Sequence, residues 1–267
     1  MSEWTIDDCI SLARRAGAAI MEIYAQDFDV QAKSDDSPLT AADMASHRII
    51  CDGLAALTPD VPILSEESKT TEWSVRGTWT RYWLVDPLDG TREFVKKNGE
   101  FTVNIALIEN GESVLGVVYA PAMDYLVHGE RGVGAFLRDG ERDVELVTQR
   151  PAPNPLRVAA SRSHLDARTA AALEKMGPTE RIGMGSSLKF CRIAEGRIDV
   201  YPRFGPTSEW DTAAAQCVLE AAGGVVLKLD GEPLRYNTKE SVLNPDFIAL
   251  GDAGLNFRAW LGGEGNG

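Results

Sequence analysis

The feature that most constrains the fold is the dipeptide Asn110-Gly111, which lies between two runs of alternating β-forming residues. The runs cover residues 101–108 and 114–119, and Asn-Gly between such runs is a strong signal of a β-hairpin. Further short β runs and one more turn follow, at residues 125–128 and 133–137 and at Asp139-Gly140. This succession of hairpins predicts a mostly antiparallel sheet.

Two amphipathic helices are expected before the sheet. Residues 5–26 carry apolar side chains at helical spacing, and Thr5 with Asp8 forms a plausible capping pair at the start. A second helix is expected to begin at Thr40. Because an amphipathic helix buries its apolar face, the two helices should pack on the sheet, which gives an α+β layered fold.

The dense prolines of residues 150–155 mark the best domain boundary. Beyond them short strands and helices alternate, which is typical of an α/β unit. We therefore predict two domains, an α+β domain at residues 1–150 and a smaller α/β domain at residues 151–267.

The composition excludes several classes of protein. The net charge of −13, from 27 Lys and Arg against 40 Asp and Glu, argues against a general nucleic-acid surface. No stretch approaches a membrane span, and the first twenty residues lack the pattern of a secretory signal, so a cytoplasmic location is expected. The 4 widely spaced cysteines suggest buried thiols rather than disulfides or zinc ligands.

A pair of acids follows an apolar run at Asp86-Pro-Leu-Asp-Gly-Thr91. Taken alone, this sequence is an ordinary β-turn. However, an ionised carboxylate at the end of a buried strand needs a partner, and Asp86 and Asp89 together suggest a cation. Gly90 permits a close backbone approach, and the backbone amides of Gly90, Thr91 and Arg92 could face an anion. The turn therefore also fits a metal-assisted phosphate site.

Three other acids could join this pair, and each has a simpler explanation. Glu66 follows a short strand at residues 61–64, either in a surface turn or beside Asp86 if the two strands are neighbours. Asp43 is either the acid of a capping box begun by Thr40 or a residue that faces the acidic pair. Asp211 is either the N-cap of an alanine-rich helix or a fourth acid of the site.

Together these motifs resemble the lithium-sensitive, magnesium-dependent inositol monophosphatase superfamily. The shared pattern is an acidic pair after a strand, then D-P-x-D-G-T, then W-D at the start of a late helix. The stretches Gly185-Ser-Ser-Leu-Lys-Phe-Cys191 and Tyr201-Pro-Arg-Phe-Gly-Pro206 resemble the 3'(2'),5'-bisphosphate nucleotidase (CysQ) branch. The resemblance implies a layered α/β sandwich of the inositol monophosphatase and sugar phosphatase type, in which the first domain binds metal and the second completes the cleft.

The resemblance also implies a role for each acid. Glu66, Asp86 and the carbonyl of Leu88 would hold a first Mg²⁺, and Asp86, Asp89 and Asp211 a second. Glu66, with Asp43 through water, would hold a third and weaker ion.

For the reaction itself, the resemblance implies that Asp43 and Thr91 orient and deprotonate the attacking water, with Glu66 also part of the catalytic group. The amides of Gly90 and Thr91 would bind the phosphate, and Leu88, Asp89 and Asp211 would also belong to the substrate-binding residues.

Three residues of the second domain match nucleotide-binding positions of the branch, namely Ser186, Lys189 and Arg203. The alternative for the two cations is a solvated or ion-paired surface position. The segment Ser161-Arg-Ser-His164 is expected to line the same cleft.

The expected activity is hydrolysis of the 3'-phosphate of adenosine 3',5'-bisphosphate, with 3'-phosphoadenylyl sulfate as a second substrate, in sulfate assimilation. The alternatives are an inositol monophosphatase of broad specificity and, from another class, an accessory protein of the transcription machinery. The expected partner is a small phosphorylated nucleotide, for a monomer or homodimer in the cytoplasm or at the periphery of the inner membrane, with neither a nucleic-acid surface nor a membrane span.

Overall fold

A computed structural model describes residues 4–26, 38–68, 71–160 and 166–261. Up to residue 146 the elements are α1 (Ile6–Tyr24), α2 (Pro38–Leu57), β1 (Ile63–Ser65), α3 (Trp73–Arg76), β2 (Arg81–Asp89), α4 (Thr91–Val95), β3 (Thr102–Glu109), β4 (Glu112–Ala120), η1 (Pro121–Met123), β5 (Tyr125–Glu130), β6 (Gly134–Asp139) and β7 (Arg142–Leu146). After it they are β8 (Leu156–Ala160), α5 (Ala167–Met176), β9 (Thr179–Gly183), α6 (Leu188–Ala194), β10 (Val200–Arg203), η2 (Glu209–Asp211), α7 (Ala213–Ala221), β11 (Val225–Lys228), β12 (Phe247–Leu250) and η3 (Phe257–Trp260).

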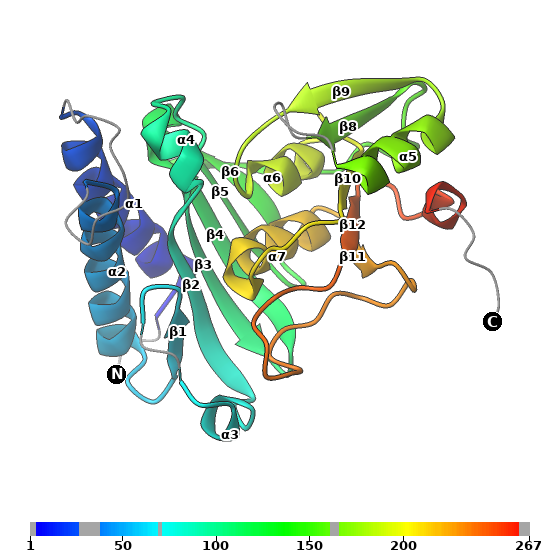
Figure 1. Ribbon diagram of the computed structural model, residues 1–267. Coiled ribbons are helices and arrows are strands. Elements are labelled where there is room, and N and C mark those ends of the chain that lie inside the picture. Colours follow the sequence, from blue (N-terminus) through cyan, green and yellow to red (C-terminus); the bar gives the residue numbers. More distant parts are fainter. Residues whose placement is uncertain (1–3, 27–37, 69–70, 161–165, 262–267) are drawn as a thin grey trace.

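The elements form alternating layers of helix and sheet (Figure 1). Helices α1 and α2 cover one face of a seven-stranded sheet of order β1-β2-β3-β4-β5-β6-β7. Helices α6 and α7 lie between that sheet and a five-stranded sheet of order β11-β12-β10-β8-β9. All neighbours in the larger sheet are antiparallel except β1 and β2. The predicted antiparallel sheet and α+β layering are confirmed.

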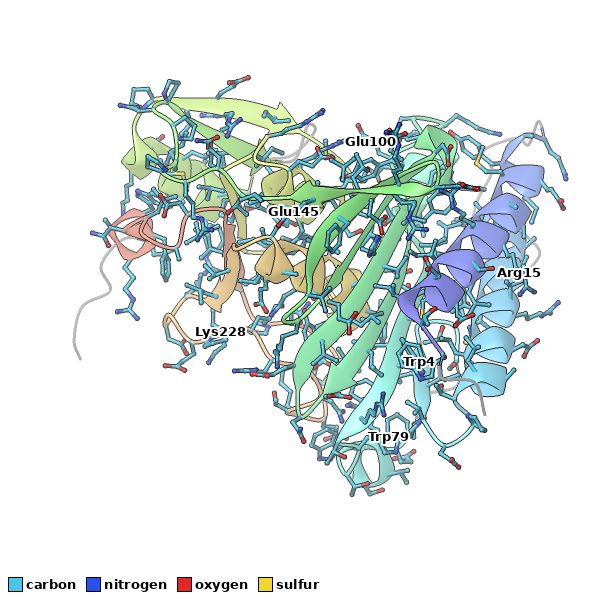
Figure 2. All side chains as sticks on the ribbon, turned by 180° about the vertical axis from the view of Figure 1, so that it is seen from behind. Trp4, Arg15, Trp79, Glu100, Glu145 and Lys228 are labelled. Atoms are coloured by element: carbon cyan, nitrogen blue, oxygen red, sulfur yellow. The ribbon has the colours of Figure 1, made fainter. Side chains whose placement is uncertain are left out.

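The central strands β2, β3 and β4 are buried on both faces, which explains why they are mostly apolar, whereas β7 at the edge is polar and exposed. Successive residues of a strand point to opposite faces. In β3, Val103 and Ile105 join the core beneath α1 and α2, whereas Ala106 and Ile108 join the core beneath α7. Trp83 of β2 extends the first core and lies 5.2 Å from the ring of Trp4, near the start of α1 (Figure 2).

Helix α7 lies unusually close to the sheet because small residues meet there. A Cβ on Gly116 of β4 would come within 2.1 Å of the carbonyl oxygen of Ala214 in α7. The run Ala213-Ala-Ala215 at the start of this helix therefore serves close packing. This core takes residues from both sides of the proline-rich segment at 150–155, so the division at residue 150 stays a prediction.

Several expected boundaries differ in the structure. The second helix begins at Pro38 rather than Thr40, since proline is well tolerated in the first helical turn. The short helix α3 was not expected. Strand β2 does not end at Asp86 but continues to Asp89. Strand β12 was not expected, and it pairs antiparallel with both β10 and β11, so the smaller sheet is mixed.

Candidate metal and phosphate site

Glu66 and Asp86 come together because their strands are neighbours. Strand β1 pairs in parallel with β2, with Ser65 opposite Val85. The Glu66 amide then donates to the Val85 carbonyl at 3.1 Å. The carboxyl-terminal ends of two parallel strands meet at the same edge of a sheet, so the acids that follow them are adjacent. The expected meeting of these two acids is therefore confirmed.

The turn after Asp86 is fixed by hydrogen bonds and by glycine. One carboxylate oxygen of Asp86 accepts from the Leu88 amide at 3.0 Å, and the Ser46 hydroxyl donates to the Pro87 carbonyl at 2.7 Å. Gly90 has a φ of 91°, and a Cβ there would lie 3.0 Å from the carbonyl oxygen of Glu100. Only glycine fits this position without strain. The turn is thus held rigidly beside α4.

Asp89 and Asp211 reach the site through contacts with the second half of the chain. Asp89 Oδ2 accepts from the Ser187 amide at 2.7 Å. Asp211 Oδ2 accepts from the Ser208 amide at 2.8 Å, because Asp211 ends the short helix η2 in a capping box. The N-cap of α7 is Thr212. The simpler explanation of Asp211 as the cap of the alanine-rich helix is therefore wrong.

The acids converge on one point. Carboxylate oxygens of Glu66, Asp86 and Asp211 all lie within 4.8 Å of one another. Asp86 is buried, with 1% of its surface exposed, and its Oδ2 has no hydrogen-bond partner in the described chain. Asp89 is not part of that cluster, but it lies close enough for its charge to raise the pKa of Asp86. The charge of Asp211 in turn raises the pKa of Asp89.

This crowding changes the protonation of the acids. Burial, and then the charge of Asp211, raises the pKa of Asp89 to about 8. Burial also raises the pKa of Asp86 well above its usual value, with the charges of Asp89, Glu66, Asp211 and Asp43 acting in the same direction. Burial raises the pKa of Asp211, although the Ser208 amide and the charges of Arg203 and Lys189 oppose the shift.

The arrangement fits a hard divalent cation. Such ions take oxygen ligands, and carboxylates are the preferred protein ligands of Mg²⁺ and Ca²⁺. A bound cation would offset the repulsion among these negatively charged acids. It would also give the unpartnered carboxylate oxygen of Asp86 a ligand bond. The assignment of Glu66, Asp86 and Leu88 to one ion and of Asp86, Asp89 and Asp211 to another stays a prediction.

Asp43 faces the same cluster from α2. It is 7% exposed, and its Oδ1 has no hydrogen-bond partner among the described residues. Burial, and then the charges of Glu67 and Glu66, raises its pKa to about 8. Since α2 begins at Pro38, Thr40 lies inside the first turn, and Asp43 is not the acid of a capping box begun by Thr40.

Thr91 is the first residue of α4, whose N-cap is Gly90. No hydrogen bond joins the Thr91 and Asp43 side chains in the described part of the chain, and their joint action on a water molecule stays a prediction.

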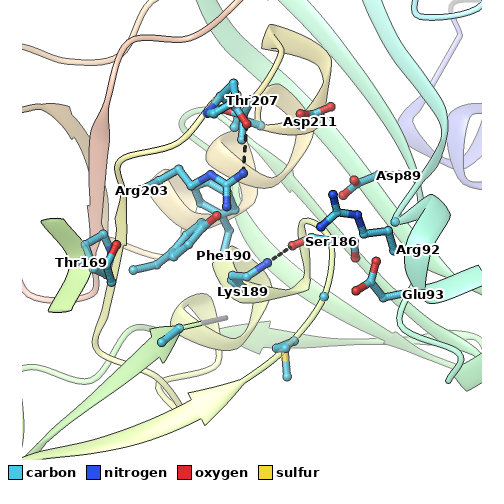
Figure 3. A pocket seen from close by; sticks show the side chains of 18 of the residues that line it. Asp89, Arg92, Glu93, Thr169, Ser186, Lys189, Phe190, Arg203, Thr207 and Asp211 are labelled. Atoms are coloured by element: carbon cyan, nitrogen blue, oxygen red, sulfur yellow. Dashed lines mark hydrogen bonds between the residues drawn. The ribbon is translucent and has the colours of Figure 1, made fainter. Parts of the chain in front are cut away.

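A cleft of about 810 Å³ opens beside the acids (Figure 3). Asp89 and Asp211 line it together with Ser186, Lys189 and Arg203, so the structure brings the predicted nucleotide-binding residues to two of the acids predicted to bind metal. Their roles in binding a nucleotide stay predictions. The segment at residues 161–164, also expected in the cleft, lies outside the described residues.

The cations of the second half are anchored to the backbone. Lys189 is 9% exposed and donates to the Ser186 carbonyl at 2.9 Å. Arg203 donates through Nε to the Gly205 carbonyl at 3.2 Å and through a terminal nitrogen to the Pro206 carbonyl at 2.9 Å. Lys189 is close enough to lower the pKa of both Asp89 and Asp211.

Sequence reasoning missed a buried polar network beneath the site. The Ser187 hydroxyl donates to Asn104 Oδ1 at 2.7 Å and lies 2.9 Å from the Thr102 hydroxyl. Asn104 is paired with Asp86 across the sheet, and Thr102 with Asp89. Polar residues at alternate positions of an apolar strand share one face, and this signal at residues 102 and 104 could have revealed the network. The side chains of Arg92 and Lys96, which also line the cleft, were missed as well.

Comparison with known proteins agrees with this geometry. The model of the inositol monophosphatase family matches residues 3–252. A protein of Escherichia coli K12 named 3'(2'),5'-bisphosphate nucleotidase CysQ is 52% identical, over 91% of this chain and 98% of its own length. The Salmonella typhimurium protein of that name is 50% identical over the same shares.

The fold is that of the same family. The crystal structure of CysQ from Bacteroides thetaiotaomicron superposes with a TM-score of 0.82 at 42% identity, over 91% of this chain and 95% of that one. The layered sandwich implied by the sequence motifs is thereby confirmed. The chain belongs to the inositol monophosphatase family, in its CysQ branch.

Proposed function

We propose that the protein is a Mg²⁺-dependent 3'(2'),5'-bisphosphate nucleotidase that hydrolyses the 3'-phosphate of adenosine 3',5'-bisphosphate to give AMP and phosphate. The observation that carries the proposal is the convergence of Glu66, Asp86 and Asp211 within 4.8 Å beside a cleft that also holds basic side chains. The 52% identical relative carries this name. 3'-Phosphoadenylyl sulfate would be a second substrate, and the activity would remove a by-product of sulfate assimilation.

Five residues would hold the ions. Glu66, Asp86 and the Leu88 carbonyl would form one Mg²⁺ site, and Asp86, Asp89 and Asp211 a second. When bound, Mg²⁺ would neutralise charge on the phosphate oxygens and lower the pKa of water. The raised pKa values of Asp86 and Asp89 support this assignment, because ionised acids so close together need a cation.

The chain itself would orient the reactants. The amides of Gly90 and Thr91, at the start of α4, would donate to phosphate oxygens. The Thr91 hydroxyl would position the attacking water, and Asp43 would take its proton, for which the unpartnered Oδ1 is suited. Hydrolysis of a phosphate monoester asks mainly for such positioning and for charge neutralisation.

Ser186, Lys189 and Arg203 would form the wall of the cleft that accepts the rest of the nucleotide. A planar guanidinium can stack on a base or contact a phosphate, and Lys supplies a point charge. Both cations lie beside Asp211, which supports a position next to the reacting phosphate.

Phosphate release from adenosine 3',5'-bisphosphate and from inositol 1-phosphate tests the proposal, with Mg²⁺ and with EDTA. We expect hydrolysis of the nucleotide in Mg²⁺, none in EDTA, and a lower kcat/KM for the inositol phosphate. A kcat/KM that favours the inositol phosphate would instead indicate a broad inositol monophosphatase.

The same assay tests inhibition by lithium. Li⁺ would occupy a Mg²⁺ position with half the charge, so LiCl should inhibit more strongly than KCl at the same ionic strength. Equal effects of the two salts would contradict this expectation.

A further inference from the structure

Four basic side chains line the cleft within the described chain, and two of them are already engaged. Lys189 donates to the Ser186 carbonyl, and Arg203 donates to two backbone carbonyls. Lys189 also acts on the charges of Asp89 and Asp211. These two cations are therefore held against the second half of the chain and the acidic cluster.

The other two cations, Arg92 and Lys96, belong to the α4 segment and are free. Both side chains are exposed and line the cleft, and neither makes a hydrogen bond or an ion pair to any described residue. Their spacing of four residues puts them on one side of a helical turn. In Figure 3 the Arg92 guanidinium extends from α4 toward Ser186, on the opposite side of the cleft from Arg203.

The chain as a whole is acidic, with 40 Asp and Glu against 27 Lys and Arg, yet these two cations lie next to each other at the cleft. Glu93 lies between them in sequence and also lines the cleft, yet it forms no ion pair with either. Since α4 begins at Thr91, directly after the acidic turn, the helix leads from the metal acids to these cations. An anionic group of the substrate placed next to the hydrolysed phosphate would meet them.

We propose that Arg92 and Lys96 form a subsite for the second anionic group of the substrate, the phosphate that is not hydrolysed. This inference rests on the proposed nucleotidase function. Selection of a bisphosphate would then depend on α4 as well as on the second half of the chain. Arg can donate two parallel hydrogen bonds to a phosphate, and Lys adds a point charge. A monoester without the second phosphate leaves both cations solvated.

The test compares two substrates that differ only in the 5'-phosphate, adenosine 3',5'-bisphosphate and adenosine 3'-monophosphate. The double variant Arg92→Gln/Lys96→Gln should lose about 10- to 100-fold in kcat/KM for the bisphosphate, mostly through KM, and less than about twofold for the monophosphate. The single variants should show part of this loss.

A matched control removes the same charges elsewhere. Arg15 on α1 and Lys175 on α5 are exposed and do not line the cleft, and Arg15 points away from the sheet (Figure 2). Arg15→Gln/Lys175→Gln should keep the preference of the wild type. An equal loss in this control would assign the effect to the overall field of the protein and overturn the proposal, as would an unchanged preference in the α4 variant or an equal loss on both substrates.

Failure of the proposed function is separately visible, because the wild type would then hydrolyse neither nucleotide in Mg²⁺. In that case the subsite can still be tested by measuring the affinities of AMP and of adenosine by calorimetry in EDTA. Without metal the acidic cluster repels phosphate, so a preference for AMP over adenosine should come from the basic side chains of the cleft, and its loss in the α4 variant assigns it to Arg92 and Lys96. We expect the wild type to prefer AMP and the Arg92→Gln/Lys96→Gln variant to lose that preference; equal preferences in the two proteins would overturn the subsite.

Discussion

Asp89 links the two halves of the site at the scale of a single residue, since its carboxylate accepts from the Ser187 amide across the cleft. We expect Asp89→Asn to keep that hydrogen bond but lose an anionic ligand. The loss should lower kcat/KM by at least about 100-fold, equivalent to about 3 kcal/mol of transition-state stabilisation. The measurement is Mg²⁺-dependent phosphate release, with circular dichroism to verify folding. Near-normal turnover in a folded variant would contradict the two-ion assignment.

Thr91 offers a second test at this scale. Because Gly90 is the N-cap of α4, the Thr91 hydroxyl is not needed as the cap of that helix. Thr91→Ala should therefore keep its melting temperature and its affinity for Mg²⁺, yet turn over about 10²- to 10⁴-fold more slowly, the usual contribution of general-base catalysis. Melting and turnover are measured on the same sample. A lower melting temperature with an unchanged rate would assign Thr91 a structural role.

At the scale of elements, the segment at residues 237–244 holds η2, which carries Asp211, through hydrogen bonds. The Asn237 amide donates to the Glu209 carboxylate at 2.9 Å, and its side chain exchanges hydrogen bonds with Arg76 of α3. Asn244 donates to the Ser208 carbonyl at 2.8 Å. The segment therefore ties the acid of the second half to the first half of the chain.

Removing one of these contacts should lower both the free energy of unfolding and the affinity for Mg²⁺. We expect Asn237→Ala to lower the free energy of unfolding by about 1–3 kcal/mol, because it removes the side-chain oxygen that accepts from one terminal nitrogen of the buried Arg76. The affinity for Mg²⁺, measured by calorimetry, should fall with it. Glu240→Ala is the matched control, since exposed Glu240 contacts Arg76 only through its backbone carbonyl. A control as damaging as Asn237→Ala would contradict this explanation.

At the scale of the whole molecule, the acidic cluster couples folding to pH and metal. Asp43 and Asp89 have pKa values of about 8 in the fold against 3.8 ordinarily, so between about pH 4 and pH 8 the folded protein binds more protons than the unfolded chain. The contribution of these acids to the free energy of unfolding is therefore favourable at low pH and falls as the pH rises through this window.

A bound cation should restore the stability that the fold loses when these acids ionise. We expect Mg²⁺ to raise the melting temperature of the EDTA-treated protein more at pH 8 than at pH 5, where it must displace protons. Thermal scans at the two pH values, with Mg²⁺ and with EDTA, give the comparison. An equal gain at both would indicate that the ion does not bind these acids.

The sequence by itself determined the elements and most of the chemistry. The Asn110-Gly111 turn and the alternation around it depend on neighbouring residues, so the hairpin of β3 and β4 was predictable. The acids around Asp86 were recognisable because each follows a strand or precedes a helix in a local motif. Helix starts were less certain, as the shift from Thr40 to Pro38 shows, since several residues there could begin a helix.

Only the tertiary structure decided which distant groups meet and which side chains stay exposed at the cleft. The Ser187 amide meets Asp89, and Asn104 lies beneath them, because strand register and the close approach of α7 through Gly116 bring these parts together. Likewise, no local pattern shows that the Arg92 side chain stays exposed at the cleft whereas Lys189 is buried, since burial depends on how distant parts of the chain pack.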